Sequence, residues 1–331
     1  KPAVAHFMPQ QVAVGVKAGI AKLCFGVRAH MEANPTHTVV KFDFRNAYNE
    51  QSRKATYAAL LAHPVLRRLV PLFHATYSPL AAIIGLPFRS EQGQQQGDPL
   101  ASISFCGTIH PEVLVADADI KSHGGMIIMD MDDGYIAGPT EHVFRVATAM
   151  AAALKASCNT TLLPAKSFCY NADPSVLRDY LAEHEEYAFT MGAAADVDPA
   201  TANAGDGLGI MVSGVPIGDD AYINYKLERK TLKTRGDIKK ITQSLQNVNA
   251  QSLYAILVYC CQPLLQFEMQ MLHPDIMVPH LANLDDALLQ MAKAATRIDF
   301  INTEDDVEGI ARERLRFPKR LKGGALREQA D

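Results

Sequence analysis

Three aspartates stand close together near the middle of the sequence. Asp130, Asp132 and Asp133 lie between two apolar runs, residues 126–129 and 135–136, with Gly134 directly behind them. Two such runs separated by Asp-Asp-Gly predict a β-hairpin with the aspartates at its turn. Asp and Gly are ordinary turn residues, but carboxylates crowded beside buried strands repel one another unless cations neutralise them. Since hard divalent cations take oxygen ligands, the segment is a candidate metal site.

A fourth aspartate stands inside another apolar run. Asp43 interrupts residues 39–44, a pattern typical of a buried strand, where a charge is costly unless it is paired or bound to a metal. Two interpretations are open. Asp43 forms a structural ion pair with Lys41 or Arg45, or it joins the hairpin aspartates in a two-metal site. Such a site catalyses in-line phosphoryl transfer by activating one oxygen and stabilising another.

Short motifs occur in a specific order around these aspartates. They are Asp-Phe-Arg-Asn-Ala-Tyr-Asn (43–49), Gln-Gln-Gly-Asp-Pro-Leu (95–100) and Met-Asp-Asp-Gly (131–134). Together they resemble motifs A, B and C of reverse transcriptases, most of all those of non-LTR retrotransposons. Leu-Leu-Pro-Ala-Lys-Ser (162–167) resembles motif D, and Gly-Val-Pro-Ile-Gly (214–218) resembles the turn that grips the primer. Each motif alone is weak, but their order and spacing are specific, and the resemblance covers most of the chain.

The resemblance implies an α+β fold, the right-hand polymerase, with an antiparallel palm sheet, interleaved fingers truncated at the N-terminus and a helical thumb. The element order along the chain also favours α+β over an alternating parallel fold. The implied boundaries are 1–36 and 52–92 for the partial fingers, 37–51 and 93–218 for the palm, and 219–331 for the helical thumb with a basic C-terminal segment.

The resemblance also implies a function and its residues. RNA-templated DNA polymerisation would use two Mg²⁺ ions, or Mn²⁺, with an RNA template, a DNA primer and dNTPs. Asp43 and Asp132 would be the principal ligands, Asp133 would assist, and the Phe44 backbone carbonyl would contribute. Tyr48 would lie beneath the sugar and exclude a 2′-hydroxyl. The implied substrate-binding residues are Arg45, Asn46, Ala47, Tyr48, Gln96, Gly97 and Lys166. The related families carry Tyr or Ala where this chain has Asp130, which either adds repulsion or pairs with a basic residue.

The overall charge of −4 does not by itself indicate nucleic-acid binding, so local charge must carry that inference. Residues 226–240 are strongly basic, and residues 312–327 are basic as well. The first run is either a solvated face or a surface that tracks phosphates. The residues predicted to contact nucleic acid are Lys226, Arg229, Lys230, Lys233 and Arg235, with Gly214, Val215 and Pro216 at the primer.

Several features concern the compartment and the extent of the chain. The 6 cysteines include no Cys-x-x-Cys pair, which favours a reduced compartment over a disulfide framework or zinc site. No signal peptide is visible, and the longest apolar run, 253–261, is too short to span a bilayer. We therefore expect an intracellular protein, nuclear or cytoplasmic, without membrane contact. The chain begins at Lys1, so we expect other domains of a longer polyprotein to be missing.

Local patterns predict the elements that position these motifs. Helices are expected from about 20 to 31, after Ser52, from Asp98-Pro99 and from Asp173-Pro174 to about 187, and Thr140 is expected to cap another. Strands are expected at 81–88 and 162–170, a strand and turn at 208–217, and a loop at 192–206. The remainder, from 219, is expected to be mainly helical.

Three functions compete for this sequence. The first is the polymerase domain of a retroelement, the second a degenerate domain that only binds nucleic acid, and the third a metal-dependent nuclease or phosphatase. The segment Gln-Gln-Gly-Asp-Pro (95–99) and the turn 214–218 favour polymerisation over hydrolysis, since hydrolysis needs neither. The intact set Asp43, Asp132 and Asp133 favours catalysis over a degenerate domain.

Overall fold

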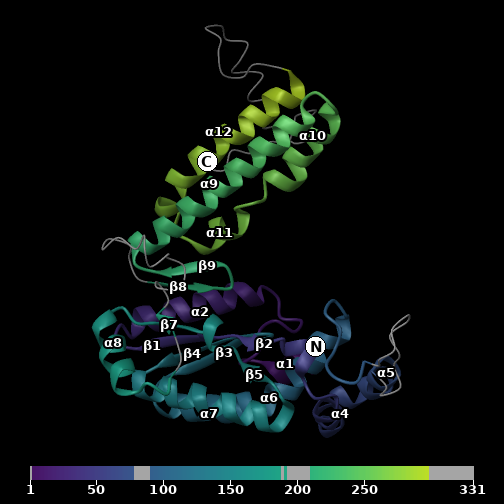
Figure 1. The fold of residues 1–331 in the computed structure, drawn as a ribbon, viewed down its shortest axis with the longest axis vertical. Coiled ribbons are helices and arrows are strands. Elements are labelled where there is room, and N and C mark those ends of the chain that lie inside the picture. The colour runs from purple at the N-terminus through teal and green to yellow at the C-terminus, as the bar shows by residue number, and fades with distance from the viewer. Residues whose placement is uncertain (1, 78–89, 188–189, 192–208, 298–331) are drawn as a thin grey trace. The chain divides into compact units, whose positions relative to one another are not determined.

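The computed structural model describes residues 2–77, 90–187, 190–191 and 209–297 (Figure 1). It divides into two compact units, residues 1–219 and residues 220–331. The expected strands at 81–88, the expected loop at 192–206 and the basic residues 312–327 lie outside the described residues. The expected fingers, palm and thumb boundaries remain predictions, although the division after residue 219 falls next to the predicted start of the thumb.

The first unit is built on a mixed sheet with the strand order β3-β4-β1-β6-β7. Neighbouring strands are antiparallel, except that β6 and β7 run parallel. Helices and a mainly antiparallel sheet are thus combined in one unit, as the α+β prediction required. The strands are β1 (Thr38–Phe42), β3 (Met126–Asp130), β4 (Asp133–Gly138), β6 (Phe168–Tyr170) and β7 (Thr190–Met191).

The predicted aspartate hairpin is present as β3–β4, with Asp130 paired to Asp133 across it. Its two-residue turn is Met131–Asp132, and Met131 has a φ of 57°. The Asp-Asp-Gly pattern suggested that Gly134 belongs to the turn, but this residue lies in β4, opposite Phe42 of β1. A Cβ at this position would overlap the Phe42 ring. Glycine is required here because the aromatic side chain packs directly on the backbone.

Helices cover both faces of the sheet (Figure 1). Helix α2 (Gly19–Ala33) lies on one face, while α6 (Pro99–Ser122) and α7 (Thr140–Cys158) lie on the other. The predicted start of α6 is confirmed, because the Asp98 side chain accepts a hydrogen bond from the Leu100 N–H at 2.9 Å and Pro99 is the first helical residue. Burial of the sheet side chains against α6 and α7 forms the main hydrophobic core, which is the largest favourable contribution to stability.

Three local expectations were wrong. Thr140 is the first residue of α7 rather than its cap, and its hydroxyl instead hydrogen-bonds that of Thr38 at 2.9 Å. The expected strand 162–170 is split because Pro164 starts a single 3-10 turn (Pro164–Lys166), which separates β5 (Thr161–Leu162) from β6. The helix after Asp173 ends at Glu183, short of 187.

The other elements of the first unit are short and connect these layers. Ser52 caps its helix as predicted, accepting from the Ala55 N–H at 3.3 Å. The remaining helices are α1 (Pro2–Phe7), α3 (Ala47–Glu50), α4 (Arg53–Ala62), a 3-10 turn (Leu66–Leu69), α5 (Val70–Thr76) and α8 (Pro174–Glu183). Two small ladders pair β2 (Phe44–Arg45) with β5, and β8 (Gly209–Val212) with β9 (Val215–Gly218).

The described part of the second unit, residues 220–297, is helical, as predicted. It consists of α9 (Asp220–Leu245), α10 (Ala250–Ile256), a π-helical turn (Leu257–Cys261), α11 (Gln266–Met271) and α12 (Pro274–Thr296). The apolar run 253–261 forms the end of α10 and the π turn, and it buries Leu253, Leu257 and Cys261. No helix among the described residues combines the length and hydropathy needed to cross a bilayer.

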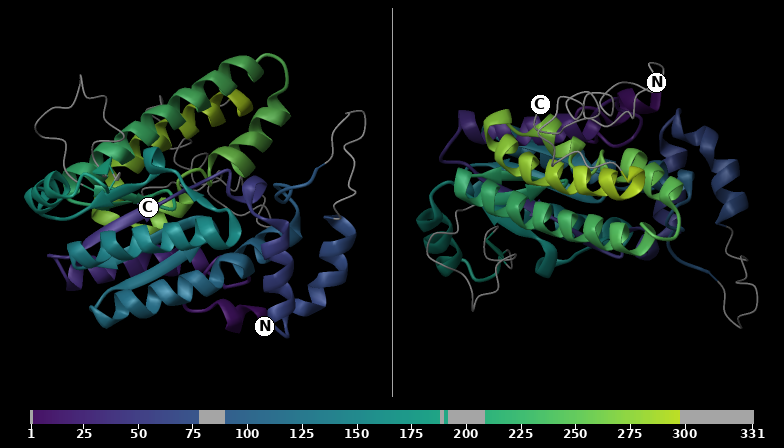
Figure 2. Two further views of the ribbon diagram at one scale, coloured as in Figure 1. Left: turned by 60° about the horizontal axis from the view of Figure 1, so that its bottom comes forward. Right: turned by 90° about the horizontal axis from the view of Figure 1, so that it is seen from above.

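An ion pair joins the two long helices under the sheet, which run side by side in Figure 2. Arg145 of α7 donates to both carboxylate oxygens of Asp119 of α6, at 2.6 and 2.8 Å. These hydrogen bonds hold the pKa of Asp119 below its usual value. The ionised carboxylate is therefore more stable in the folded protein than in the unfolded chain.

We expect Asp119→Asn to lower the free energy of unfolding at pH 7 by up to about 1 kcal/mol, the upper range for an exposed pair. Because the folded pKa is lowered, this loss is complete above the usual carboxyl pKa and disappears as the pH falls through the lowered one. Thermal unfolding of Asp119→Asn, Arg145→Gln and the double variant would measure it. Additive losses in the double variant would show that the pair contributes nothing.

Candidate functional site

The sheet brings the four predicted aspartates into electrostatic contact. Asp43 directly follows β1, and the register of β1 against β4 places it beside the aspartate hairpin. Burial raises the pKa of Asp43 first and the charge of Asp133 raises it further. Burial likewise raises the pKa of Asp132, with added contributions from Asp133, Asp43 and Asp130. Each of these carboxylates therefore raises the energy of placing a second negative charge beside it.

The motif D segment, residues 162–167, makes hydrogen bonds to the backbone of Asp43. The Asp43 N–H donates to Ser167 Oγ at 3.3 Å, and its carbonyl accepts from the Leu163 N–H at 2.9 Å. Lys166 lies in the 3-10 turn between these two contacts, and its positive charge lowers the pKa of Asp43 against the effect of burial. Lys166 is therefore close enough to Asp43 to affect its charge, while its predicted role in substrate binding stays a prediction. The Asp43 carboxylate also accepts a hydrogen bond from the N–H of Phe44.

Lys41 and Arg45, the two expected structural partners of Asp43, pair with other carboxylates. Lys41 Nζ lies 3.3 Å from Asp133 Oδ1 and above the Tyr135 ring, 5.9 Å from its centroid. Arg45 pairs with Glu50. The charge of Lys41 still lowers the pKa of Asp43. Lys166 and Lys41 therefore both partly neutralise the carboxylate cluster.

The donor set fits a hard divalent cation in its chemistry, because it consists of carboxylate oxygens whose shared burial and repulsion a cation would relieve. Its side chains are nevertheless not gathered around one point. Among the described residues, no group of three or more His, Cys, Asp and Glu is arranged to hold a metal ion. Asp133 faces Lys41 instead. A cation bound by this set would compete with Lys41 for Asp133.

A pocket of about 330 Å³ unites residues from three of the motifs. Tyr48 comes from motif A, Gln96 and Gly97 come from motif B, and Asp132 comes from the hairpin. The complete lining is Tyr48, Gln96, Gly97, Asp98, Pro99, Ala101, Ser102 and Asp132. The pocket therefore opens at the N-terminus of α6, where the helix dipole favours anions, although the Leu100 and Ala101 N–H groups are already bonded to Asp98.

Tyr48 forms one wall of this pocket with a fixed orientation. Its ring packs against Phe105 of α6, with 4.9 Å between centroids. Its hydroxyl approaches Met131 Sδ at 3.2 Å and is hydrogen-bonded by Ser102. Burial is the main cause that raises the pKa of Tyr48, so it stays a neutral phenol. Tyr48 thus packs against the core and lines the pocket at the same time.

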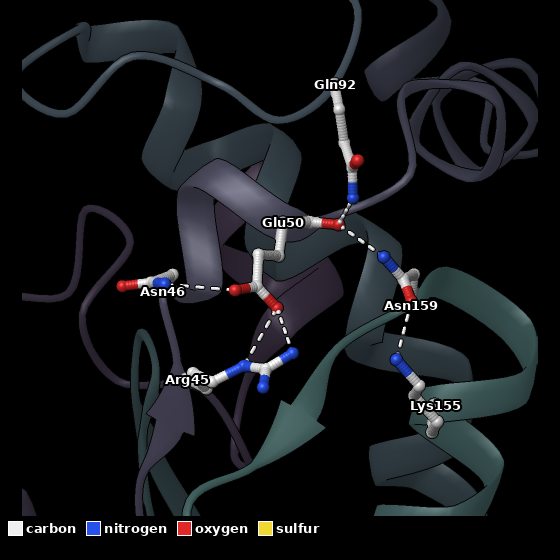
Figure 3. Close-up of polar contacts among 6 residues, drawn as sticks. All are labelled: Arg45, Asn46, Glu50, Gln92, Lys155 and Asn159. Carbon is white, nitrogen blue, oxygen red and sulfur yellow. Dashed lines mark hydrogen bonds and ion pairs between the residues drawn. The ribbon is translucent and has the colours of Figure 1, made fainter.

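Arg45 and Asn46, predicted to bind substrate, are both engaged by Glu50 (Figure 3). Arg45 donates to Glu50 Oε2 through Nε at 3.2 Å and through a terminal nitrogen at 3.0 Å, and Asn46 donates to Oε1 at 3.0 Å. The Glu50 carbonyl accepts from Gln92 and Asn159. The hydrogen bonds that Asn46 and then Arg45 donate to the Glu50 carboxylate lower its pKa. Ala47 is buried.

The second hairpin, β8–β9, contacts the aspartate hairpin through Ser213. The Ser213 N–H donates to the Tyr135 hydroxyl at 2.9 Å, and its Oγ lies 3.5 Å from Asp130 Oδ2. Asp130 therefore faces a hydroxyl rather than the basic residue that one alternative expected. Burial and then Asp133 raise its pKa, so it adds repulsion. Of the predicted primer contacts, Val215 and Pro216 are buried and Gly214 is exposed.

In the second unit, the five predicted basic residues all lie on α9, but they differ in their surroundings. Lys226 and Arg229 lie over the Tyr225 ring, 6.0 and 5.6 Å from its centroid. Lys230 pairs with Glu268, which is 2% exposed, so this lysine also has a structural role that sequence did not indicate. Lys233 is exposed, and Arg235 lines a groove of about 530 Å³ between α9 and α12.

Sequence reasoning missed a set of contacts that fasten motif A to the segment before motif B. The Gln94 N–H donates to the Tyr48 carbonyl at 2.6 Å, and the Gly93 N–H donates to Gln51 at 3.1 Å. Gly93 has a φ of 68°, and a Cβ there would overlap the Asn49 carbonyl. Only glycine allows this approach. The run Gln-Gly-Gln-Gln-Gln contained the signal, since an isolated glycine in a polar run often marks close backbone packing.

No protein-family model matches the chain, and no curated protein matches it. Among solved structures, apo telomerase from Candida tropicalis shares 10% identity at a TM-score of 0.43, over 90% of this chain and 57% of that one. Telomerase from Candida albicans in complex with a TWJ fragment of telomeric RNA shares 11% at 0.36, over 94% and 52%. The chain thus spans about half the length of these proteins. At these values no residue's role follows from the likeness.

The raised pKa of Asp132 predicts that this residue costs stability. Its pKa in the folded protein is above the usual carboxyl value. The loss of folding stability is therefore complete when the pH is above the raised pKa, and it vanishes when the pH is below the usual pKa. We expect Asp132→Asn to raise the melting temperature by a few degrees at pH 7 in EDTA, with a smaller gain as the pH falls. Asp119→Asn, whose pKa shift is opposite, should lower it. A lower melting temperature for Asp132→Asn would contradict the burial of this charge.

Proposed function

We propose that this chain is the polymerase domain of a non-LTR retroelement protein, and that it extends a DNA primer on an RNA template by two-metal phosphoryl transfer. The observation that carries the proposal is the pocket that joins Tyr48, Gln96, Gly97 and Asp132. These residues come from three motifs that are far apart in the sequence. A nuclease or phosphatase would not require the glutamine-rich loop and an aromatic wall beside its carboxylates.

The chemistry requires neutralisation of charge on the transferred phosphoryl group more than covalent participation of the protein. Asp43 and Asp132 would hold Mg²⁺ or Mn²⁺ with help from Asp133 and the Phe44 carbonyl. The bound ions supply Lewis-acid stabilisation and activate the primer hydroxyl. Lys41, released from Asp133, would then face the same anionic region.

The rest of the pocket would bind and orient the incoming dNTP. Tyr48 presents an aromatic face where the sugar would lie, and Phe105 behind it prevents the ring from retreating. Gln96 and Gly97 lie beside the N-terminus of α6, which suits an anionic or polar group. Arg45 and Asn46 would reach the triphosphate by exchanging Glu50 for phosphate oxygens. Lys166, next to Asp43, would stand near the pyrophosphate as a proton donor.

Basic residues on α9 would track the phosphates of the template and primer. Lys226, Arg229, Lys233 and Arg235 would contribute charge without reading sequence. Lys230 would contribute less, because its ammonium is already paired with Glu268. Gly214, exposed at the tip of the β8–β9 hairpin, would approach the primer end, while Val215 and Pro216 support the hairpin from inside.

A degenerate domain that binds nucleic acid without catalysis is the second candidate. The Lys41–Asp133 ion pair favours it, because an internal ammonium already neutralises part of the cluster. So does the lack, among the described residues, of carboxylates converging on one point. The two functions differ in one measurable property, which is whether added divalent cation supports primer extension.

Asp43→Asn and Asp132→Asn should each abolish primer extension on an RNA template. Each change keeps the side-chain size and removes a carboxylate where transition-state charge develops, so the rate should fall by at least about 10³-fold. Steady-state extension with Mg²⁺ and with Mn²⁺ would measure it. Binding of the primer–template in EDTA should be unchanged or slightly stronger, because less negative charge faces the phosphates.

Asp130→Asn is the matched control for these variants. It removes a neighbouring carboxylate that faces Ser213 instead of the pocket. We expect extension at the wild-type rate or above it. A loss as large as that of Asp132→Asn would show that the wrong aspartate of the hairpin has been assigned. Absence of extension by the wild-type protein would favour the degenerate domain.

Tyr48→Ala should admit ribonucleotides, because the ring that would exclude a 2′-hydroxyl is gone. Tyr48→Phe is the matched control, since it keeps the ring against Phe105 and removes only the hydroxyl, and it should preserve discrimination. The ratio of kcat/KM for dNTP and NTP with each variant would measure the effect. We expect a fall of at least about 10-fold for Ala, the loss of roughly 1.4 kcal/mol of discrimination. Equal ratios for all three proteins would place the sugar elsewhere.

A further inference from the structure

The segment 10–12 pairs with β3, the first strand of the aspartate hairpin. Val12 donates its N–H to the Met129 carbonyl at 2.9 Å, and the Met129 N–H donates to the Gln10 carbonyl at 2.7 Å. Gln11 and Met129 form a parallel bridge. Because β3 is an edge strand of the sheet, this segment covers its outer edge up to the start of the turn.

The Gln11 side chain continues this pairing beyond the end of the strand. Its Nε2 donates to the Met131 carbonyl at 3.2 Å, and its Oε1 accepts from the Met131 N–H at 2.9 Å. The same oxygen accepts from the Ala13 N–H at 3.2 Å. Gln11 is 2% exposed, so water does not compete for these bonds. A side-chain amide can pair with the N–H and the carbonyl of one residue at once because it has both a donor and an acceptor.

Met131 is the residue whose backbone decides where Asp132 points. Its φ of 57° is uncommon for a residue with a side chain and carries a strain that the surroundings must hold. The two peptide planes beside Met131 are both anchored, one through its N–H and the other through its carbonyl. The second plane is the central peptide of the turn, whose rotation interconverts turn types. It is joined directly to the Cα of Asp132.

We propose that Gln11 is a positioning residue for the aspartate hairpin: its bidentate pairing with Met131 fixes the turn in the one conformation that directs Asp132 into the pocket. This rests on the proposed function only for its effect on catalysis. The effect on the turn conformation stands on the hydrogen bonds alone. The segment 10–12, which lies within the expected fingers (1–36), thereby acts on the carboxylates through the protein backbone.

Gln10 provides a matched control next in the chain. It is also a buried glutamine, 5% exposed, and its backbone takes part in the same pairing with Met129. Its side chain turns the other way and donates to Asp117 of α6 at 2.6 Å. Gln10→Met and Gln11→Met therefore each remove one buried side-chain amide beside β3. Only Gln11→Met removes the hydrogen bonds to the Met131 backbone in the turn.

The experiment compares these two variants with the wild-type full chain by hydrogen–deuterium exchange of the peptide covering 126–138, and by primer extension. Gln11→Met should speed exchange in this peptide about 10-fold and lower kcat by about 10- to 100-fold, with KM for the nucleotide nearly unchanged, since misplacing a catalytic group acts on the chemical step. Gln10→Met should lower the melting temperature to a similar degree but leave exchange of 126–138 and kcat at wild-type levels.

Gln11→Asn tests the same idea if Gln11→Met does not fold, because it keeps a neutral amide but is one methylene too short to pair with both the N–H and the carbonyl of Met131. It should give an intermediate kcat and intermediate exchange. Unchanged exchange in the Gln11 variants, or equal losses of kcat for Gln10→Met and Gln11→Met, would overturn the positioning role. A wild-type protein without extension whose Gln11 variants still show faster exchange would refute the proposed function and support the anchoring of the turn.

Discussion

Mutual repulsion of half-buried carboxylates is the constraint on which this structure depends. Asp43, Asp130 and Asp132 each have a raised pKa, caused first by burial and then by neighbouring negative charges. Such a cluster opposes folding, so other interactions must hold it together. The antiparallel register of β1 against β4 brings the backbones close, and the apolar residues beneath the sheet supply the stability that offsets the repulsion.

Parts of the cluster and of its turn are held by hydrogen bonds from different segments of the chain. Ser167 and Leu163 hold Asp43, Gln11 holds Met131 in the turn, and Ser213 contacts both Tyr135 and Asp130. Hydrogen bonds of this kind are directional, so they fix geometry that apolar packing alone leaves free. The polar residues around the hairpin thus explain how an unfavourable arrangement of charges keeps one conformation.

The same arrangement relates the site to its two candidate functions. In a polymerase, a divalent cation would relieve the repulsion between the clustered carboxylates. The cation would therefore bind more tightly to them. In a domain that only binds nucleic acid, the carboxylates need only be compatible with folding. The Lys41–Asp133 ion pair contributes to that by neutralising part of their charge. The pocket beside Tyr48 supports the first function, because it brings residues of three motifs to one opening.

Sequence by itself determined the features that depend on neighbouring residues. The aspartate hairpin and the Asp98–Pro99 start of α6 follow from turn and cap preferences that act over a few positions. Tertiary structure alone decided the partners. Lys41 pairs with Asp133 rather than Asp43, Lys230 pairs with Glu268, and Gln11 binds Met131 at a separation of 120 residues. Apolar periodicity says which face of a strand or helix is buried, but not which distant polar group arrives there, because that depends on the packing of the whole chain.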